Sequence, residues 1–424
     1  MPTDRHHLER TVRLYPWLHA FHSAYFWLPV FFLYFSKHLP LSEVLLLESI
    51  YYAAVFVIEV PSGWISDRFG RRRTLIVAAL ANIAACGLFA AGDSLAWFMP
   101  AQVLLATSIA FMSGTDTALH YDALTELGRA GEYDDREARV VHIAALATAA
   151  AAMLGGLVGA LSLGATYTLS LLAAVGALAI TLLMSEPSHR VEPDDETGLG
   201  LLATIRRCLA MLRSRQLAWL FGFAVIAYAL NHVPYHLNQP YVDLVITSLE
   251  GTDDDGARFG SNASTPIVLG LMTTVIMMFR SWAGRRSIAI RDRIGLVPLL
   301  LGSMALQVGL AIACAAVLHW SVAIALFARS VGTGLQAAPL NAAIVPRVNR
   351  TIRATFLSVK SLAGRLSYAS LLFTMSWATR GEGSETMDWE SLSKMALTGA
   401  VVGVAALVVL GVFVPRAVGA SARD

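Results

Sequence analysis

The sequence has few charged residues: Asp, Glu, Lys and Arg make up 15% of its 424 residues, whereas soluble proteins carry about 25%. It has only three cysteines, Cys86, Cys208 and Cys314, and no two of them stand at the spacing of a disulfide framework or a metal cluster. It lacks the glycine-rich loop that ends in lysine and serine or threonine in nucleotide-driven proteins. No nucleophile–base pair stands out. We therefore expect no enzyme, no cofactor and no nucleic-acid partner.

Apolar sequence is what the chain has in abundance, at 56% of its residues. A membrane-spanning helix needs about 20 apolar residues, and the chain offers twelve such runs joined by short polar turns. This pattern predicts an all-α integral membrane protein with twelve transmembrane helices in two six-helix bundles. The expected spans are 15–36, 43–64, 74–92, 96–120, 139–161, 165–185, 217–245, 264–284, 294–315, 319–345, 354–378 and 394–415.

The distribution of positive charge predicts the orientation. An even number of spans places both termini on one side of the membrane. On this assignment most of the 32 Lys and Arg lie on that side or at the span ends next to it, and only Lys37, Arg258, Arg380 and Lys394 lie on the other side. Because cytoplasmic loops carry the excess of Lys and Arg, we expect cytoplasmic termini and a protein of the cytoplasmic membrane. The polar residues 1–10 precede an apolar run too long for a signal peptide, so we expect them to be retained.

The alternation of spans and short loops breaks after the sixth span. Residues 186–196 are rich in charge and proline, which marks a boundary between two halves. We expect a six-helix bundle at 1–187, a cytoplasmic linker at 188–215 and a second bundle at 216–424. In the linker, leucines at helical spacing alternate with arginines. They predict an amphipathic helix that lies on the inner membrane surface or, equally well, packs as a lid under the bundle.

A short charged turn at residues 61–73 separates the second and third spans. Its aspartate and arginines cannot lie in hydrocarbon, so we expect the turn to be in water. Its segment Asp67-Arg68-Phe69-Gly70 recurs 225 residues later as Asp292-Arg293-Ile294-Gly295. The second copy has Ile288 where the first has a glycine four residues before the aspartate. This degenerate repeat indicates two related, pseudo-symmetric halves.

The first copy, with Gly63 before Asp67 and Arg71, Arg72 and Arg73 after Gly70, resembles the loop 2–3 signature of the major facilitator superfamily. The resemblance implies transport by alternating access around a central cavity. It also implies that this turn latches the two halves on the cytoplasmic side in the outward-open state. Alternatively, the arginines only anchor the topology. The residues that we expect at this gate are Gly63, Asp67, Arg68, Gly70, Arg71, Asp116, Asp122, Asp292, Arg293 and Gly295.

Two features depart from the drug–proton antiporters of that superfamily. They often carry an arginine early in the fourth span, where this chain has Gln102. They also often carry a glycine-proline pair in the fifth span, where this chain has Gly155, Gly156 and Gly159 without proline. Both departures weaken an antiport assignment, although the small residues still permit close helix packing.

Asp116 and His120 lie four residues apart near the cytoplasmic end of the fourth span, so they share a helix face. Asp116 is expected to pair with Arg68 or Arg71 in the latch. A proton relay through the aspartate–histidine pair is the alternative, because imidazole titrates near neutrality, and simple interfacial polarity is a third. Asp67 precedes the third span and is expected to cap its N-terminus or to face the positive end of a neighbouring helix.

Ionisable and polar groups deep in the spans point to a cavity, because each is costly unless it is paired or faces water. Prolines 234 and 240 interrupt a polar stretch of the seventh span, which predicts a broken helix lining a wet cavity. Acids gather in the N-terminal half and cations in the C-terminal half, either as inter-half ion pairs or as a wall that binds an anionic solute. The residues expected at this substrate and proton cavity are Glu48, Glu59, Tyr25, Trp27, His232, Tyr235, His236, Gln239, Arg329, Gln336 and Arg365.

The function that we predict is secondary active transport of a small organic solute, with proton-coupled export favoured over uptake and the proton gradient as its energy source. The proton-coupling candidates are Glu48, Glu59 and the His232/His236 face. The two histidines could also be metal ligands, a role that the sequence favours less. Arg329 and Arg365 are the candidates for the charge of the solute. The expected partners are the small molecule and the lipid bilayer, and the expected state is a monomer. The alternatives are an uptake transporter, a lipid flippase, and a non-transporting scaffold or sensor.

Overall fold

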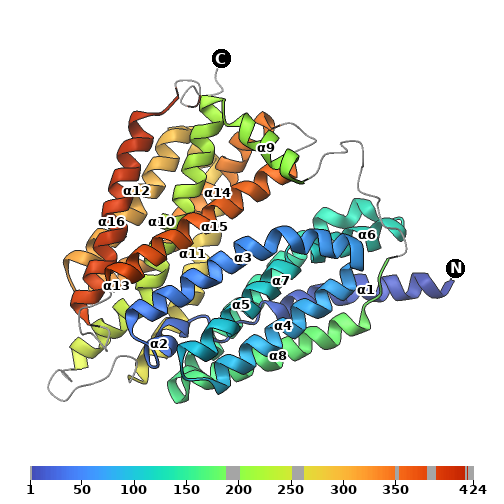
Figure 1. Cartoon of the computed structure of the whole chain (residues 1–424), viewed down its shortest axis with the longest axis horizontal. Coiled ribbons are helices and arrows are strands. Elements are labelled where there is room, and N and C mark those ends of the chain that lie inside the picture. Colours follow the sequence, from blue (N-terminus) through green and yellow to red (C-terminus); the bar gives the residue numbers. More distant parts are fainter. Residues whose placement is uncertain are drawn as a thin grey trace. The chain divides into compact units, whose positions relative to one another are not determined.

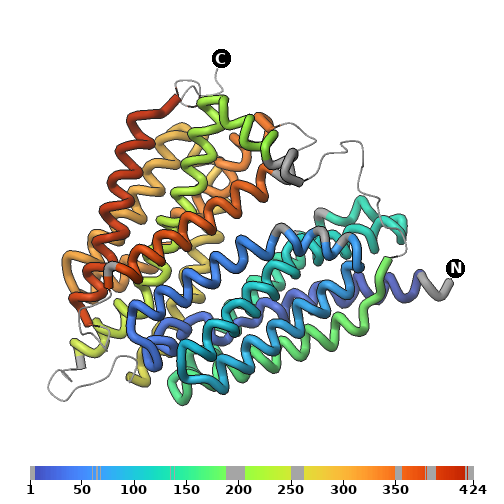
Figure 2. Tube along the Cα trace, viewed as in Figure 1, coloured from blue at the N-terminus to red at the C-terminus, as the bar shows by residue number. Residues whose placement is uncertain are grey.

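The computed structural model describes residues 2–187, 201–250, 262–348, 353–379, 388–415 and 418. Throughout these ranges the regular structure is helical, with no strand. Figure 2 traces the chain from its N-terminus in blue to its C-terminus in red.

The helices group into two compact units. Unit 1 comprises Met1–Leu39, Ile50–Glu196 and Pro266–Thr273, and unit 2 comprises Pro40–Ser49, Thr197–Thr265 and Thr274–Asp424. Residues 40–49 and 266–273 therefore belong to a different unit from the rest of the helices that contain them. The sequence boundaries at 187 and 215 stay a prediction, because residues 188–200 of the linker between them lie outside the described residues.

Unit 1 is built around α4, which packs against α5 and α8, while α1 packs against α7 and α8 (Figure 1). Its core contains an aromatic cluster in which Tyr34, Phe35, Phe89, Phe98 and Tyr167 contact one another. Its elements are α1 (Pro2–His22), α2 (Phe31–Ser36), most of α3 (Leu41–Phe69), α4 (Arg71–Ala91), α5 (Leu95–Met112), α6 (Thr115–Glu126), η1 (Ala130–Glu132), α7 (Tyr133–Leu161) and α8 (Leu163–Leu183).

Unit 2 is built around α10, which packs against α12, α15 and α16 (Figure 1). The predicted linker helix is present as α9, and it packs against α15, with Cys208 buried in the unit's apolar core. Its elements are α9 (Leu201–Met211), α10 (Arg215–Glu250), most of α11 (Ser264–Ile294), α12 (Leu296–Ala316), α13 (Trp320–Ala325), η3 (Leu326–Ser330), α14 (Val331–Ile344), η4 (Val345–Arg347), α15 (Arg353–Ala378) and α16 (Trp389–Val412).

Nine helices within the described ranges are long and apolar enough to cross a membrane. The other three expected spans are also helical. The first and the tenth are interrupted, and the eleventh, α15, carries Lys360 and Arg365, which lower its hydropathy. Large apolar side chains such as Val401, Val408 and Val412 of α16 are exposed, as expected where a helix faces lipid.

The break predicted in the seventh span is wrong. Helix α10 runs without interruption through Pro234 and Pro240. A membrane helix tolerates proline where neighbouring helices and side chains satisfy the freed backbone groups, and α10 is enclosed by three helices of its own unit.

The breaks occur elsewhere. The first span separates into α1 and α2 at residues 23–30, where Thr148 donates to the carbonyl of Ser23 (3.0 Å) and Phe26 N–H donates to Ser170 (3.1 Å). The tenth span tightens into the 3₁₀ turn η3, which carries Arg329. Pro29 lies near the end of the first break, just before α2, whereas the second break contains no proline.

The charged turn at 61–73 is shorter than expected. Helix α3 continues to Phe69 and α4 begins at Arg71, so Gly70 alone turns the chain. Its φ of 102° and ψ of 142° lie in a region that only glycine occupies readily. Gly295 does the same between α11 and α12, with φ 89° and ψ 162°. The repeat read from the sequence is therefore a repeat of backbone conformation.

Candidate functional site

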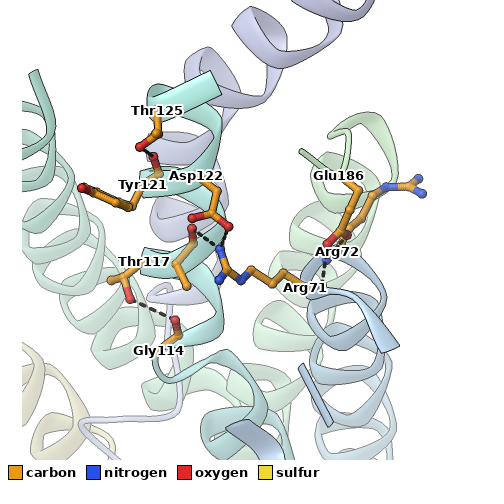
Figure 3. Close-up of polar contacts among 9 residues, drawn as sticks. Arg71, Arg72, Gly114, Thr117, Tyr121, Asp122, Thr125 and Glu186 are labelled. Atoms are coloured by element: carbon orange, nitrogen blue, oxygen red, sulfur yellow. Dashed lines mark hydrogen bonds and ion pairs between the residues drawn. The ribbon is translucent and has the colours of Figure 1, made fainter. Parts of the chain in front are cut away.

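The start of α4 is held by a carboxylate that the sequence did not reveal. Glu186, just after α8, accepts hydrogen bonds from the backbone N–H groups of Arg71 (2.8 Å) and Arg72 (2.7 Å) (Figure 3). The first N–H groups of a helix have no partner within the helix, and a negative charge there also favours the helix dipole. Glu186 therefore has the capping role that was expected of Asp67, whose side chain lies outside the described part of the chain.

Arg71 joins α4 to α6. Its Nη1 forms an ion pair with the carboxylate of Asp122 and donates to the carbonyl of Ala118 (2.7 Å) (Figure 3). Gly114, with φ 79°, separates α5 from α6 and so redirects the segment that carries Asp122. Asp116 was expected to pair with Arg68 or Arg71, and for Arg71 this is wrong, because Arg71 pairs with Asp122 instead. All of these contacts lie within unit 1.

The second copy of the motif makes fewer contacts. Asp292 pairs with its neighbour Arg291 (2.6 Å), and Arg293 is exposed. The geometry of the glycine is repeated, but among the described residues the ion pair between neighbouring helices is not. Gly63 and Arg68 in the first copy are exposed on the last turns of α3.

Asp116 and His120 contact different partners, so they are not a pair. His19 Nε2 of α1 lies 3.2 Å from Asp116 Oδ2, and His120 Nδ1 lies 3.2 Å from Glu137 Oε2 of α7. The ring of Tyr15 stacks on His120 (centroids 4.0 Å apart) and meets His19 edge-on (4.7 Å). This buried group of titratable residues joins three helices of unit 1. Sequence reasoning missed its members on α1 and α7, because a pairing between distant helices leaves no local pattern.

Exposed charges fix the link that follows α6. Hydrogen bonds from Arg129 and Arg136 lower the pKa of Glu132 to about 2. These pairs keep η1 next to the start of α7, but they are too exposed to contribute much to stability.

In unit 2, two residues predicted from the sequence and one that was not predicted meet in a buried triad. Glu48 of α3 lies with Oε2 at 3.1 Å from His236 Nε2 of α10, and His236 Nδ1 lies 2.6 Å from the Tyr368 hydroxyl of α15. The same hydroxyl lies 3.1 Å from the carbonyl of His232. Glu48 and His236 were predicted to handle protons, whereas Tyr368 was missed.

The triad can hold either of two proton counts. If the Tyr368 hydroxyl donates to His236 Nδ1, the imidazole is neutral and its Nε2–H donates to a Glu48 carboxylate. If the hydroxyl instead donates to the His232 carbonyl, Nδ1 carries a proton, and the Glu48–His236 pair holds one proton more. A rotation of one hydroxyl thus accommodates uptake and release of a proton at a site shielded from bulk water.

One turn earlier on α10, a chain of hydrogen bonds begins at Asn231. Its Nδ2 donates to Gln336 Oε1 of α14 (2.8 Å), and Gln336 Nε2 donates to Ser303 Oγ of α12 (2.8 Å). Arg329 lies with its guanidinium 5.0 Å from the ring centre of Tyr235, the geometry of a cation–π contact.

The remaining predicted residues are divided between the units. In unit 1, Trp27 stacks on Tyr167 and contacts Tyr25, and Glu59 lies half-buried on α3. In unit 2, Gln239 is buried on α10 and Arg365 is half-buried on α15. Among the residues that the structure describes, no group of three or more His, Cys, Asp or Glu is placed to hold a metal ion.

Comparison with known proteins places this geometry in context. The sequence profile of the Major Facilitator Superfamily matches residues 17–372. No curated protein matches the chain. A mutant of the nucleoside transporter NupG superposes with a TM-score of 0.76 at 11% identity, over 96% of this chain and 100% of that one.

Two further solved structures are similar. An auto-inhibited POT family peptide transporter has a TM-score of 0.67 at 15% identity and 98% coverage of both chains. A D-xylose-proton symporter has a TM-score of 0.59 at 14% identity, over 98% of this chain and 100% of that one. At these identities the matches show the fold alone, and they confirm the predicted all-α fold with twelve membrane helices.

Proposed function

Because the chain belongs to the Major Facilitator Superfamily, we propose that it is a secondary active transporter that couples the movement of a small organic solute to the movement of a proton. The observation that carries the coupling is the buried triad of Glu48, His236 and Tyr368. Ionisable side chains inside a membrane helix bundle are costly and therefore rare, and those that occur commonly mark proton relays. Their geometry accommodates one proton more or less without a change of partners.

The sequence favours export over uptake, and export driven by the proton gradient requires antiport. The alternative is symport, and the likeness in fold to a D-xylose-proton symporter supports keeping it. The direction of proton flow relative to the solute decides between them.

The charged motif supplies the cytoplasmic gate in this proposal, with Gly63, Asp67, Arg68, Gly70 and Arg71 in the first copy. The ion pair between Arg71 and Asp122 supports a mechanical role, because it makes α4 and α6 move as one body. The single-residue turn at Gly70 supports it as well, because so short a link transmits a displacement of α3 to α4.

The test uses the purified protein in sealed vesicles with a pH-sensitive dye inside, challenged with organic anions, cations and neutral compounds. We expect at least one class to drive proton movement in the wild type. Vesicles loaded with that solute become acidic inside when it leaves by antiport and alkaline when it leaves by symport. A folded wild type that moves protons with none of the compounds would refute the coupling.

The matched variants are Glu48→Gln and Glu43→Gln, on the same helix. Glu48→Gln keeps the shape of the side chain but cannot release a proton, so solute-driven proton movement is lost while solute exchange continues. Glu43→Gln lies outside the triad and retains both. If Glu48→Gln still moves protons at the wild-type rate, Glu48 is not the coupling residue.

A further inference from the structure

Arg329 is a buried cation that has no anionic partner among the residues that the structure describes. Its side chain extends from η3, the residue is 6% exposed, and its Nε is buried without a hydrogen-bond partner. Its guanidinium forms no ion pair or hydrogen bond with any residue that the structure describes, and its one contact of this kind is with the ring of Tyr235. A guanidinium cannot lose its charge to relieve this situation. Its position inside the apolar unit therefore calls for an anion from outside the protein.

The backbone around Arg329 is held in place. Gln307 Nε2 of α12 donates to the carbonyl of Arg329 (2.8 Å). Gly332, one turn further on, lies so close to Gln307 that a Cβ at that position would overlap its amide. The 3₁₀ turn is thus fixed against α12, and the guanidinium is presented from a rigid base.

An unpartnered acceptor lies on α10 about one turn before Tyr235, the residue whose ring Arg329 contacts. The hydroxyl of Ser303 donates to the carbonyl of Leu300 (2.7 Å), so its oxygen must accept from Gln336 Nε2, and Gln336 Oε1 must accept from Asn231 Nδ2. The backbone carbonyl therefore fixes the orientation of both amides. The free end of the chain is Asn231 Oδ1, which is buried and has no partner within the described residues.

The two unsatisfied groups can serve one ligand. Asn231 and Tyr235 are four residues apart on α10, so they lie on one face about 6 Å apart along the helix, and Arg329 covers the Tyr235 ring. The rest of this face is aromatic and half-buried: Tyr228 stacks on His232 (4.4 Å), and His232 meets Tyr235 edge-on. A ligand here can offer an anionic group to Arg329, a hydrogen-bond donor to Asn231 and an apolar body to the rings.

We propose that unit 2 binds an organic carboxylate that also carries a hydroxyl or ammonium donor, with Arg329 holding the carboxylate and Asn231 Oδ1 accepting from the donor. This inference rests on the proposed function, since it names the class of solute that is transported. His236 of the proton triad directly follows Tyr235 on α10. The solute and the proton therefore bind side by side on one helix.

The test is equilibrium binding by calorimetry in detergent, where no gradient exists. Three probes differ by one group each: mandelate has the carboxylate and the hydroxyl, phenylacetate lacks the hydroxyl, and 1-phenyl-1,2-ethanediol lacks the carboxylate. We expect mandelate to bind about 10-fold more tightly than phenylacetate and about 100-fold more tightly than the diol. Equal affinity for all three, or no binding of mandelate, overturns the proposal.

Variants assign the two groups. Arg329→Gln should reduce mandelate affinity about 100-fold, whereas Arg347→Gln, which removes an exposed arginine that bonds to Gln216 and the Ala343 carbonyl, should not change it. Because Arg329 is unpaired, Arg329→Gln should unfold at a temperature no lower than wild type, which shows that the variant is folded. Asn231→Ala should weaken mandelate binding while leaving phenylacetate binding unchanged. Equal losses for both probes would refute the role of Asn231.

Binding and transport separate the two proposals. If mandelate binds through Arg329 but drives no proton movement in vesicles, the coupling is wrong and the anion site stands. If another class of solute drives proton movement and Arg329→Gln is without effect, the anion site is wrong and the coupling stands.

Discussion

Gly70 and Gly63 belong to one motif, but only Gly70 has a backbone conformation that requires glycine. Gly70 has φ 102° and ψ 142°, where a side chain clashes with its own backbone. We expect Gly70→Ala to lower the free energy of unfolding by roughly 1–3 kcal/mol. Unfolding of the purified protein, followed by circular dichroism in a denaturing detergent, measures the change.

Gly63→Ala is the matched control. Gly63 lies inside α3, and a Cβ added there meets no atom within 4 Å. Alanine favours a helix over glycine by up to about 1 kcal/mol, so this variant should be unchanged or slightly more stable. A larger loss of stability from Gly63→Ala than from Gly70→Ala would contradict the conformational account of the motif.

In the proposed coupling, the triad changes its proton count through the Tyr368 hydroxyl, so this hydroxyl can be tested directly. Tyr368→Phe leaves the buried His236 Nδ1 without its 2.6 Å partner. Loss of one such bond costs about 1–1.5 kcal/mol, and we expect solute-driven proton movement to fall about tenfold. Stopped-flow fluorescence of the pH dye in vesicles measures the rate.

Tyr241→Phe controls for a general loss of packing. The Tyr241 hydroxyl donates to the carbonyl of Val317 (2.7 Å) and accepts from His319 N–H (2.9 Å), both structural contacts. It should lower stability to a similar extent without changing proton movement per folded molecule. Equal rates in Tyr368→Phe and Tyr241→Phe would exclude Tyr368 from the proton path.

At the scale of elements, α7 is notable for how closely the chain passes over it. At Gly155 the backbone of Phe26, in the link between α1 and α2, lies where a Cβ would be. We expect Gly155→Ala to destabilise the protein by roughly 1–3 kcal/mol, because a backbone carbonyl cannot move aside as a side chain can. The melting temperature in detergent reports the effect.

Gly87→Ala in α4 is the comparison, since its Cβ would meet only the end of Leu171 at 3.5 Å, an ordinary contact. It should melt at the wild-type temperature or above. If both variants melt alike, the link does not pack on Gly155 as described.

The positions of the helices could be predicted from the sequence, whereas their interruptions could not. Apolar runs locate spans because the bilayer requires about 20 such residues, and charge at 61–73 was enough to separate two of them. The proline rule failed at Pro234, where enclosing helices override a local preference. The 3₁₀ turn at Arg329 contains no helix-breaking residue, so the local sequence does not predict it.

The candidate site divides in the same way. Glu48 and His236 were recognisable one by one as costly residues in spans. Their pairing, and the contribution of Tyr368, depend on three helices that are remote in sequence. Asn231 and Arg329 are each visible in the sequence, but their unsatisfied atoms emerge only when every hydrogen bond around them is counted.

At the scale of the whole molecule, the charge bias predicts the side of the membrane on which each loop lies. We expect Arg213, between α9 and α10, to face the cytoplasm and Glu390, at the start of α16, to face outside. Both residues are exposed. The native cysteines, Cys86, Cys208 and Cys314, are all buried, so a single added cysteine provides the signal.

A membrane-impermeant maleimide applied to intact cells should label Glu390→Cys and leave Arg213→Cys unlabelled until the membrane is permeabilised. Glu390→Cys removes only an exposed ion pair with Lys394, which is worth little to stability, and Arg213 contributes no buried contact. The wild type gives the background. The opposite labelling pattern would show that the topology is the inverse of the predicted one. The charged motif at Gly70 would then lie on the outer face, where it could not act as a cytoplasmic gate.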